Sequence, residues 1–236
     1  NFYNPGVTAN DAFKPVTRYF DRITRPEQII SSLPHAIQVM LDPADCGPAC
    51  ISLSQDIQGE VFDYPEEFFK ERVHTIRRPK PDNFQIKEAA ELIKKSKKPI
   101  IIAGGGVFYS DATDELSDFA KKHNIPVTQT VMGYSSMKKD HTHYLGTIGG
   151  LGGRAANNLS KETDTAIAIR TKLADFTTGS WANFENPNFK LVSINAARFD
   201  ANKHMAQAIV GDAKVSLIEL SQALGSWKAD DRWYKK

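Results

Sequence analysis

The sequence is short of cysteine, of net charge and of long apolar runs, and each shortage excludes a class of protein. Cys46 and Cys50 are its only cysteines, too few for a thiolate zinc site, so they predict reduced thiols in a cytoplasmic protein. Its 30 Lys and Arg residues nearly balance 28 Asp and Glu, which predicts no nucleic-acid partner. No apolar run approaches the roughly 18 residues of a membrane span, so no membrane partner is expected either.

Phosphate-binding motifs are missing as well. Gly104-Gly105-Gly106 has neither the third glycine of a dinucleotide fingerprint nor the lysine of a phosphate loop. The preceding run, 99–103, is short and β-branched, which predicts a strand buried on both faces of a parallel sheet. The three glycines that follow predict a tight turn. Two interpretations remain open: small residues are needed only for the backbone to turn, or the turn forms part of a ligand site at the edge of the sheet.

The remaining pattern predicts an α/β fold with a doubly wound, mostly parallel sheet. Asp82 with Gln85, Ser110 or Asp111, and Asp212 are the expected helix caps. Pro34 either kinks the first helix or moves its start to Leu33. Further strands are expected near 16–17, 49–53, 127–130, 165–169, 189–195 and 207–210, and helices over 24–41, 82–96, 112–120, 154–159 and 212–224.

Composition shifts divide the chain into four segments. A partial α/β unit is expected over 1–62 and the main sheet domain over 83–225. Between them, 63–82 is rich in proline and charge, which is typical of an extended linker. We interpret 226–236 as a linker cut short, without an element of its own.

The loop between 132 and 153 carries two further candidate features. His141 and His143 alternate without a third ligand nearby in sequence, so we interpret them as loop histidines rather than metal ligands. The glycines of 149–153 precede a helix, where free backbone amides are expected to suit an anion.

Three groups of segments together resemble thiamine-diphosphate enzymes of the acetolactate-synthase type. Segments 8–15 and 47–58 resemble the last part of the family's pyrimidine-binding domain. Segments 99–106, 144–150 and 210–213 resemble its central, Rossmann-like domain, and the linker falls where the family joins the two. The resemblance covers nearly all 236 residues.

Segments 11–27, 54–67 and 76–81 resemble one branch of this family more closely. Its members are hydrolases that open trihydroxycyclohexanedione to 5-deoxy-glucuronate in myo-inositol catabolism. The resemblance implies a parent enzyme that uses thiamine diphosphate and magnesium on a small cyclic polyol-dione, and that forms a homo-oligomer through its pyrimidine-binding domain.

The family's reactive groups are expected to lie outside this chain. The resemblance places the activating glutamate upstream of Asn1 and the Gly-Asp-Gly metal-diphosphate motif downstream of Lys236, and no Gly-Asp-Gly occurs here. We therefore expect an internal fragment that has no catalytic residue, no metal ligand and no bound thiamine diphosphate.

The resemblance also marks two sets of binding residues. Phe13, Lys14 and Gln55 match positions near the substrate entrance, although Lys14 stands for a glutamine and Gln55 for a lysine, so only a location carries over. Relatives show glycine where Arg170 stands, which argues against tight dinucleotide binding and favours a vestigial scaffold. A flavin or ADP site would be walled by Gly104, Gly105, Gly106, Gly152, Gly153, Thr171, Lys172, Asn195 and Asp212.

Three other interpretations remain open. The chain could belong to an acetolactate synthase or a glyoxylate carboligase. It could be a free-standing nucleotide-binding module related to the sirtuin sheet, although the four zinc-spaced cysteines of sirtuins are missing. It could also be a passive interaction module.

Overall fold

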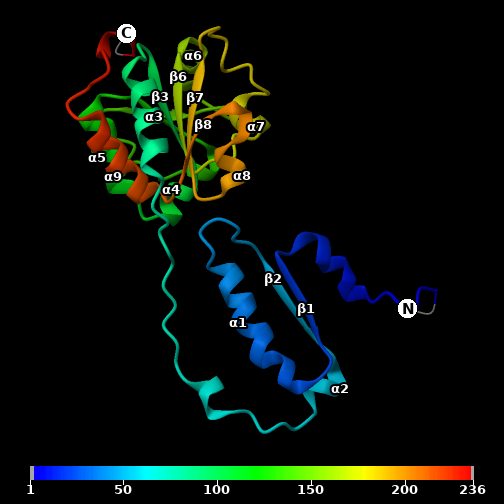
Figure 1. Ribbon diagram of the computed structural model, residues 1–236. Helices are drawn as coiled ribbons and strands as arrows, with labels where there is room; N and C mark the ends of the chain where they lie inside the picture. Colours follow the sequence, from blue (N-terminus) through cyan, green and yellow to red (C-terminus); the bar gives the residue numbers. More distant parts are fainter. Residues whose placement is uncertain (1–2, 235–236) are drawn as a thin grey trace. The chain divides into compact units, whose positions relative to one another are not determined.

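The structure is a computed structural model that describes residues 3–234. The chain divides between Arg77 and Arg78 into two compact units, called here the first and the second unit (Figure 1). The division falls within the segment 63–82 that we interpret as a linker. Each unit has its own parallel sheet.

The first unit is a single β-α-β crossover. Strand β1 (Tyr19–Ile23) pairs in parallel with β2 (Ala49–Leu53), and helix α1 (Ile29–Met40) connects them. Pro34 lies inside α1, which continues through it and begins at Ile29 rather than Leu33. The shorter elements of this unit are η1 (Ala9–Val16), η2 (Pro26–Gln28), α2 (Gln55–Gln58) and η3 (Glu66–Phe69).

The strand expected at 16–17 is wrong. Val16 ends the 3-10 helix η1, and the strand begins three residues later at Tyr19. The N–H of Thr8 donates to the Asp11 carboxylate at 2.7 Å, a local bond that stabilises the turn of η1. The side-chain cap therefore favours the helical turn up to Val16, although the β-branched side chains of Val16 and Thr17 favour a strand.

The second unit contains a six-stranded, fully parallel sheet in the order β5-β4-β3-β6-β7-β8. This arrangement confirms the predicted doubly wound fold. The predicted strand segments 99–103, 127–130, 165–169, 189–195 and 207–210 are observed as β3 (Pro99–Ala103), β4 (Val127–Gln129), β6 (Thr165–Ile169), β7 (Lys190–Asn195) and β8 (Gln207–Val210).

Strand β5 (Tyr144–Thr147) lies in a segment that we expected to be loop. It is a four-residue edge strand, half-buried along its length, with Gly146 at a positive φ of 94°. Such a strand lacks the continuous apolar run of a central parallel strand, so the sequence pattern does not reveal it.

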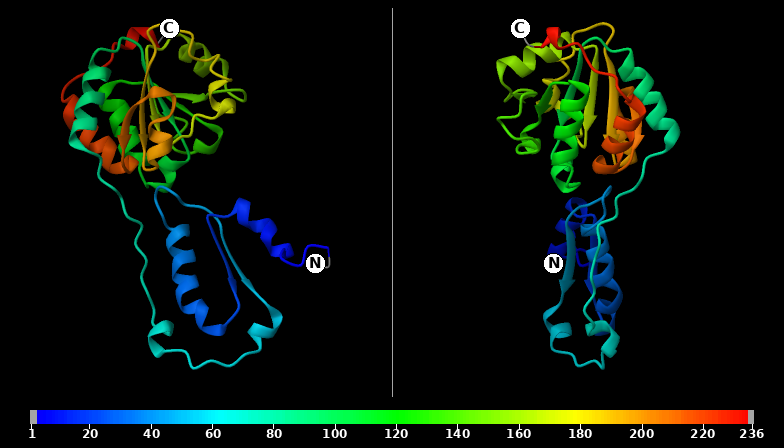
Figure 2. Two further views of the ribbon diagram at one scale, coloured as in Figure 1. Left: turned by 45° about the vertical axis from the view of Figure 1, so that its right-hand side comes forward. Right: turned by 90° about the vertical axis from the view of Figure 1, so that its left-hand side faces the viewer.

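Helices cover both faces of this sheet (Figure 2). Along β3, Ile101 and Ala103 face one core while Ile100 and Ile102 face the other, as strand alternation requires. Helices α3 (Asn83–Lys94), α5 (Thr113–His123) and α9 (Ala213–Leu224) pack over the first core, and α6 (Arg154–Glu162) contributes to the second. The second unit therefore has three layers.

Two of the expected helix caps are correct and two are wrong. The Asp82 carboxylate accepts from the Phe84 N–H at 2.7 Å, and Asp212 accepts from the Lys214 N–H at 3.0 Å. Gln85 does not complete a capping box, because its side-chain oxygen accepts from the Val210 N–H at 2.9 Å. Neither Ser110 nor Asp111 caps α5, which begins after Ala112.

Short helical turns complete the second unit. None of the helices in residues 3–234 is both long and apolar enough to cross a membrane. The short elements are α4 (Gly106–Tyr109), η4 (Val131–Gly133), α7 (Asp175–Thr178), α8 (Arg198–Ala201), η5 (Lys203–Met205) and η6 (Asp231–Trp233).

The chain after α9 packs on the second unit instead of forming a tail without an element. Trp233, at the end of η6, and Tyr234 are buried in the second core. The Ala229 N–H donates to the His123 carbonyl at 2.9 Å, and the Tyr234 hydroxyl donates to the Asn124 side chain at 2.7 Å. The segment 226–234 therefore packs on this unit through Ala229, Trp233 and Tyr234.

A buried histidine joins this last segment to α5 and α9. His123 has no exposed surface, and its Nδ1 lies 2.8 Å from the Trp227 carbonyl. A carbonyl only accepts, so Nδ1 carries the proton and Nε2 accepts from the Ser221 hydroxyl at 3.0 Å. Burial lowers the pKa of His123, and the nearby Lys122 and Lys228 lower it further.

We predict that acid destabilises the second unit through His123. Its folded-state pKa lies below the ordinary 6.5, so the stabilisation is complete above pH 6.5 and is lost as the pH falls below that value. Urea unfolding between pH 7.5 and 5 should show this decline, and His123→Gln should be less stable at neutral pH but flatter over the range. His204, whose pKa burial also lowers, is exposed, so His204→Gln should keep most of the decline. An equal slope in His123→Gln would contradict the assignment.

Candidate functional site

The order in which successive strands are added to the sheet reverses between β3 and β6. From β3 the sheet grows through β4 to β5 on one side, and from β6 through β7 to β8 on the other. Ligands of open parallel sheets bind at such a switch point, beyond the carboxyl ends of the strands. The loops that meet here carry Gly104–Gly106 after β3 and Arg170–Thr171 after β6.

The glycines hold these two loops in direct contact. The Gly104 N–H donates to the Ile169 carbonyl at 2.8 Å, and the Gly106 N–H to the Arg170 carbonyl at 3.3 Å. A Cβ on Gly104 would lie 2.7 Å from the Arg170 carbonyl carbon, and one on Gly105 would lie 2.6 Å from the Met132 carbonyl oxygen. No side chain fits at either distance, so this geometry favours a backbone turn over the wall of a ligand site.

Arg170 occupies the space above the glycine turn. Its φ of +52° is in the left-handed region, which glycine adopts without strain and arginine does not. A Cβ on Gly106 would lie 2.7 Å from the Arg170 Nε, so the side chain crosses this turn. Its Nη1 lies 3.4 Å from the Asn195 side-chain oxygen. The space above the glycine turn is therefore filled by the Arg170 side chain.

Thr171 and Asn195 bind backbone groups next to this contact. Thr171 Oγ1 accepts from the Leu173 N–H at 3.2 Å, and Asn195 Oδ1 accepts from the Ala197 N–H at 3.1 Å. Asn195 Nδ2 donates to the Thr171 carbonyl at 3.5 Å. The structure thus brings Gly104–Gly106, Thr171 and Asn195 together, and these polar groups already have protein partners.

The second glycine run does not offer free amides. The N–H groups of Gly152 and Gly153 donate to the carbonyls of Gly149 and Thr147, both at 2.8 Å. Asn157, which we did not single out, donates to the Gly149 carbonyl at 3.0 Å and accepts from its N–H at 2.9 Å. The amides of these glycines therefore have protein partners, and an anion site at the helix entry that begins with Arg154 stays a prediction.

Asp212 and Lys172 lie at the margin of the predicted cleft. Asp212 is buried, caps α9 and approaches the Arg78 guanidinium at 3.4 Å, and the same guanidinium donates to the Ser110 carbonyl. Arg78, the first residue of the second unit, is therefore joined to the start of α9 and to the loop after α4. The Lys172 side chain is exposed, while its carbonyl accepts from Lys203 Nζ at 3.0 Å.

The residues predicted near a substrate lie in the first unit. Phe13 and Lys14 are in η1, where the Lys14 ammonium pairs with Asp11 at 2.8 Å. Gln55 begins α2, after β2, and its side chain is exposed. In residues 3–234, no hydrogen bond or ion pair joins Gln55 to the other two, so their shared role remains a location.

The histidines of the 132–153 loop bind protein groups. His143 is buried, with Nε2 3.0 Å from the Asn124 side-chain oxygen and Nδ1 3.0 Å from the Thr142 hydroxyl. Within the described part of the chain, no group of three or more His, Cys, Asp or Glu side chains is placed to hold a metal ion. These residues therefore do not fit a magnesium-diphosphate site.

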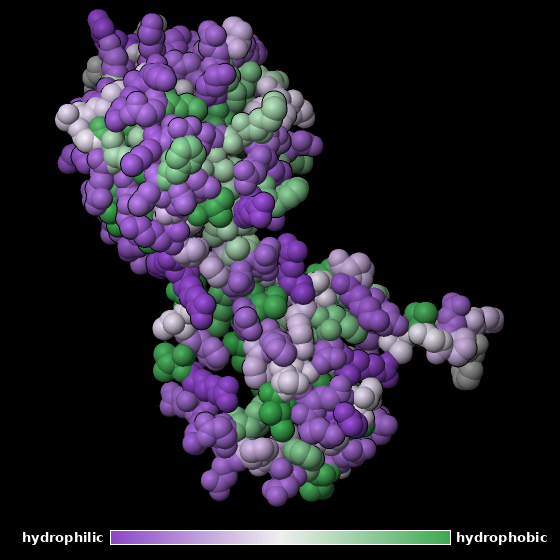
Figure 3. Space-filling model, viewed as in Figure 1, coloured by the Kyte–Doolittle hydropathy of each residue, from purple (hydrophilic) through white to green (hydrophobic). Residues whose placement is uncertain are grey.

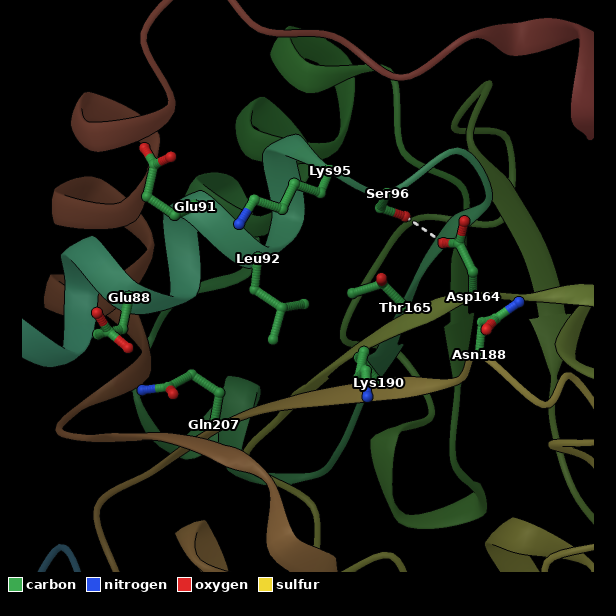
Figure 4. Close-up of a pocket in the computed structure, with 10 residues that line it drawn as sticks. All are labelled: Glu88, Glu91, Leu92, Lys95, Ser96, Asp164, Thr165, Asn188, Lys190 and Gln207. Atoms are coloured by element: carbon green, nitrogen blue, oxygen red, sulfur yellow. Dashed lines mark hydrogen bonds between the residues drawn. The ribbon is translucent and has the colours of Figure 1, made fainter.

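A hollow of about 500 Å³ lies at the opposite, amino end of the strands (Figure 4). Glu88, Glu91 and Lys95 of α3 line one side, and Lys190 begins β7 on the other. Asp164 accepts from the Ser96 hydroxyl here and from the Lys97 N–H at 2.8 Å. Its carboxylate therefore secures the turn before β3, and the hollow is a junction of elements away from the switch point.

Residues 86–220 match the family described as "Thiamine pyrophosphate enzyme, central domain", and the chain belongs to this family. Curated relatives include the 3D-(3,5/4)-trihydroxycyclohexane-1,2-dione hydrolase of Clostridium perfringens (strain 13 / Type A), which is 49% identical over 94% of this chain. The enzyme of the same name from Bacillus subtilis (strain 168) is 46% identical over 97%. The chain spans 35% and 36% of their lengths.

A solved structure shares the fold. It is described as a candidate thiamin diphosphate-dependent enzyme from Mycobacterium smegmatis and superposes with a TM-score of 0.74. The match covers 97% of this chain and 43% of that chain at 21% identity. At this identity the likeness concerns the fold alone.

We predict that Gly104→Ala destabilises the second unit by about 1–3 kcal/mol, the usual cost of forcing atoms into a filled space. The new methyl group would collide with the Arg170 backbone, which has no flexible end to move aside. Gly153→Ala is the matched control, because no heavy atom lies within 4 Å of its Cβ position. Urea midpoints measure both variants, and equal midpoints would refute the contact.

Proposed function

We propose that this chain is a segment of a thiamine-diphosphate-dependent C–C hydrolase that opens trihydroxycyclohexanedione to 5-deoxy-glucuronate in myo-inositol catabolism. The observation that carries the proposal is the 49% identity to the Clostridium perfringens hydrolase over 94% of this chain. In this proposal, 1–62 is the end of the pyrimidine-binding domain, 63–82 its linker, 83–225 the central domain, and 226–236 leads to the pyrophosphate-binding domain. The parent would be a cytoplasmic homo-oligomer.

The second unit would serve that enzyme as a scaffold. When bound to the parent, thiamine diphosphate with magnesium would supply the carbanion chemistry, but the residues described here do not form a site for them. Glycine contacts and the Arg78–Asp212 pair instead hold the carboxyl ends of the strands in a fixed arrangement. Phe13, Lys14 and Gln55 are proposed to lie near the substrate entrance.

The complete product of the gene should hydrolyse trihydroxycyclohexanedione when supplied with thiamine diphosphate and Mg²⁺. Pyruvate and glyoxylate are the control substrates, because a synthase or carboligase would condense them. Product analysis by mass spectrometry separates ring opening from condensation. Acetolactate formation without ring opening would contradict the proposal and favour the carboligase alternative.

The 236-residue chain should show no binding heat with thiamine diphosphate and Mg²⁺ in titration calorimetry, because its carboxylates are not clustered. The complete gene product is the positive control. Micromolar binding by the shorter chain would show that it carries a cofactor site of its own.

We also propose that the switch point holds no flavin or ADP. This rests on Arg170, whose side chain crosses the turn where a nucleotide would approach the backbone. Thermal unfolding with ADP, FAD or NAD should leave the melting temperature unchanged, and the purified chain should show no flavin absorbance. A yellow preparation, or a rise in melting temperature with one nucleotide, would contradict this.

A further inference from the structure

Strongly exposed large apolar side chains of the second unit gather in the loops at one end of its sheet. Five of them are between 71% and 80% exposed. Single exposed apolar residues are ordinary on a protein surface, whereas a group gathered at one edge marks an interaction site. We call the five the carboxyl-edge apolar surface: Tyr109, Met132, Leu151, Phe176 and Phe199.

Topology gathers these residues at one end of the sheet. Tyr109 follows β3, Met132 follows β4, Leu151 follows β5, Phe176 follows β6 and Phe199 follows β7. Because all six strands are parallel, the loops after them share one edge. Figure 1 shows α4 and α8, which follow β3 and β7, at the same end of the sheet.

Other surfaces of this unit are different. The other exposed large apolar side chains of the unit near this edge are Phe84, Phe108, Val131 and Tyr134. Within the described residues, those away from the edge are Ile218 on α9 and Met205 before β8. Figure 3 shows a largely hydrophilic surface, with scattered hydrophobic side chains, on the side of the unit in view. The exposed large apolar side chains of this unit are therefore concentrated at the carboxyl edge.

The charges at this edge favour one kind of partner. Arg154, Lys172 and Arg198 are exposed and form no salt bridge within residues 3–234, and the Lys139 ammonium lies 4.9 Å from the Tyr134 ring centroid. Asp140 and Asp175, also without a salt bridge, only partly offset these cations. A second copy of the same edge would place like charges opposite each other, which opposes association. The partner surface that complements this edge has apolar side chains at its centre and Asp and Glu carboxylates around them.

A complementary surface of this kind could be carried by the parts of a longer protein that this chain does not include. The matched region is 35% of the Clostridium perfringens hydrolase, so about two thirds of that protein is additional chain. We propose that the carboxyl-edge apolar surface docks another part of the longer polypeptide, through apolar side chains ringed by Asp and Glu. This rests on the proposed function, because it requires that the chain work within a longer enzyme.

Hydroxyl-radical footprinting tests the docking directly, since it reports how accessible Met, Phe and Tyr side chains are. The 236-residue chain is compared with the complete product of the gene at equal concentration. Met132, Phe176 and Phe199 should be oxidised several-fold more slowly in the complete product, with Ile218 as the internal control whose rate stays constant. The readout does not depend on activity, so it stands apart from the substrate test.

Charged variants provide a second measurement. Met132→Glu and Phe199→Glu should lower the melting temperature of the complete product and leave that of the 236-residue chain unchanged, because both side chains are exposed there. Ile218→Glu, on α9, is the matched control and should change neither protein. Equal destabilisation of both proteins would mean that the side chains act within the second unit, and would overturn the proposal.

Three footprinting results would also overturn it. Equal oxidation in the two proteins would mean that nothing covers this edge. Protection that appears in the 236-residue chain as its concentration rises, together with a dimer in sedimentation, would identify a second copy as the occupant. Protection of the complete product that disappears when bound nucleotide is removed would identify a small ligand.

Discussion

The contact between the loops after β3 and β6 is the constraint on which the second unit depends. Gly104 bonds to the Ile169 carbonyl at 2.8 Å, and no side chain fits between it and the Arg170 backbone. These strands are the innermost pair, and each contributes residues to both cores. Separating the loops would therefore disturb the centre of the sheet and both helical layers, whereas a change at β5 or β8 would affect only an edge.

The same contact closes the edge of the sheet at which folds of this kind commonly bind nucleotides. The switch point is filled by Arg170, and the neighbouring Thr171 and Asn195 bind backbone groups. The chain matches the central domain of thiamine pyrophosphate enzymes while its described residues form no metal site. These contacts fix the loops at the carboxyl edge of the sheet.

The sequence predicted the parts of the fold that depend on local pattern. Strands such as Pro99–Ala103 and Thr165–Ile169 are buried on both faces, so their apolar runs are continuous. The pattern did not reveal β5, which is short and half-buried, or the role of Gln85, whose partner Val210 is distant in sequence. For the candidate site, the residue types predicted which loops meet. They did not predict the left-handed backbone of Arg170, because that conformation depends on tertiary contacts rather than on the neighbouring sequence.

That backbone conformation has an evolutionary consequence. Arginine and glycine codons differ by a single base change, and the main chain at position 170 already adopts the dihedral region that glycine prefers. A lineage that gained glycine here would clear the space above the turn without rebuilding the loop. Access to the turn is thus governed at this position by one side chain rather than by the path of the loop.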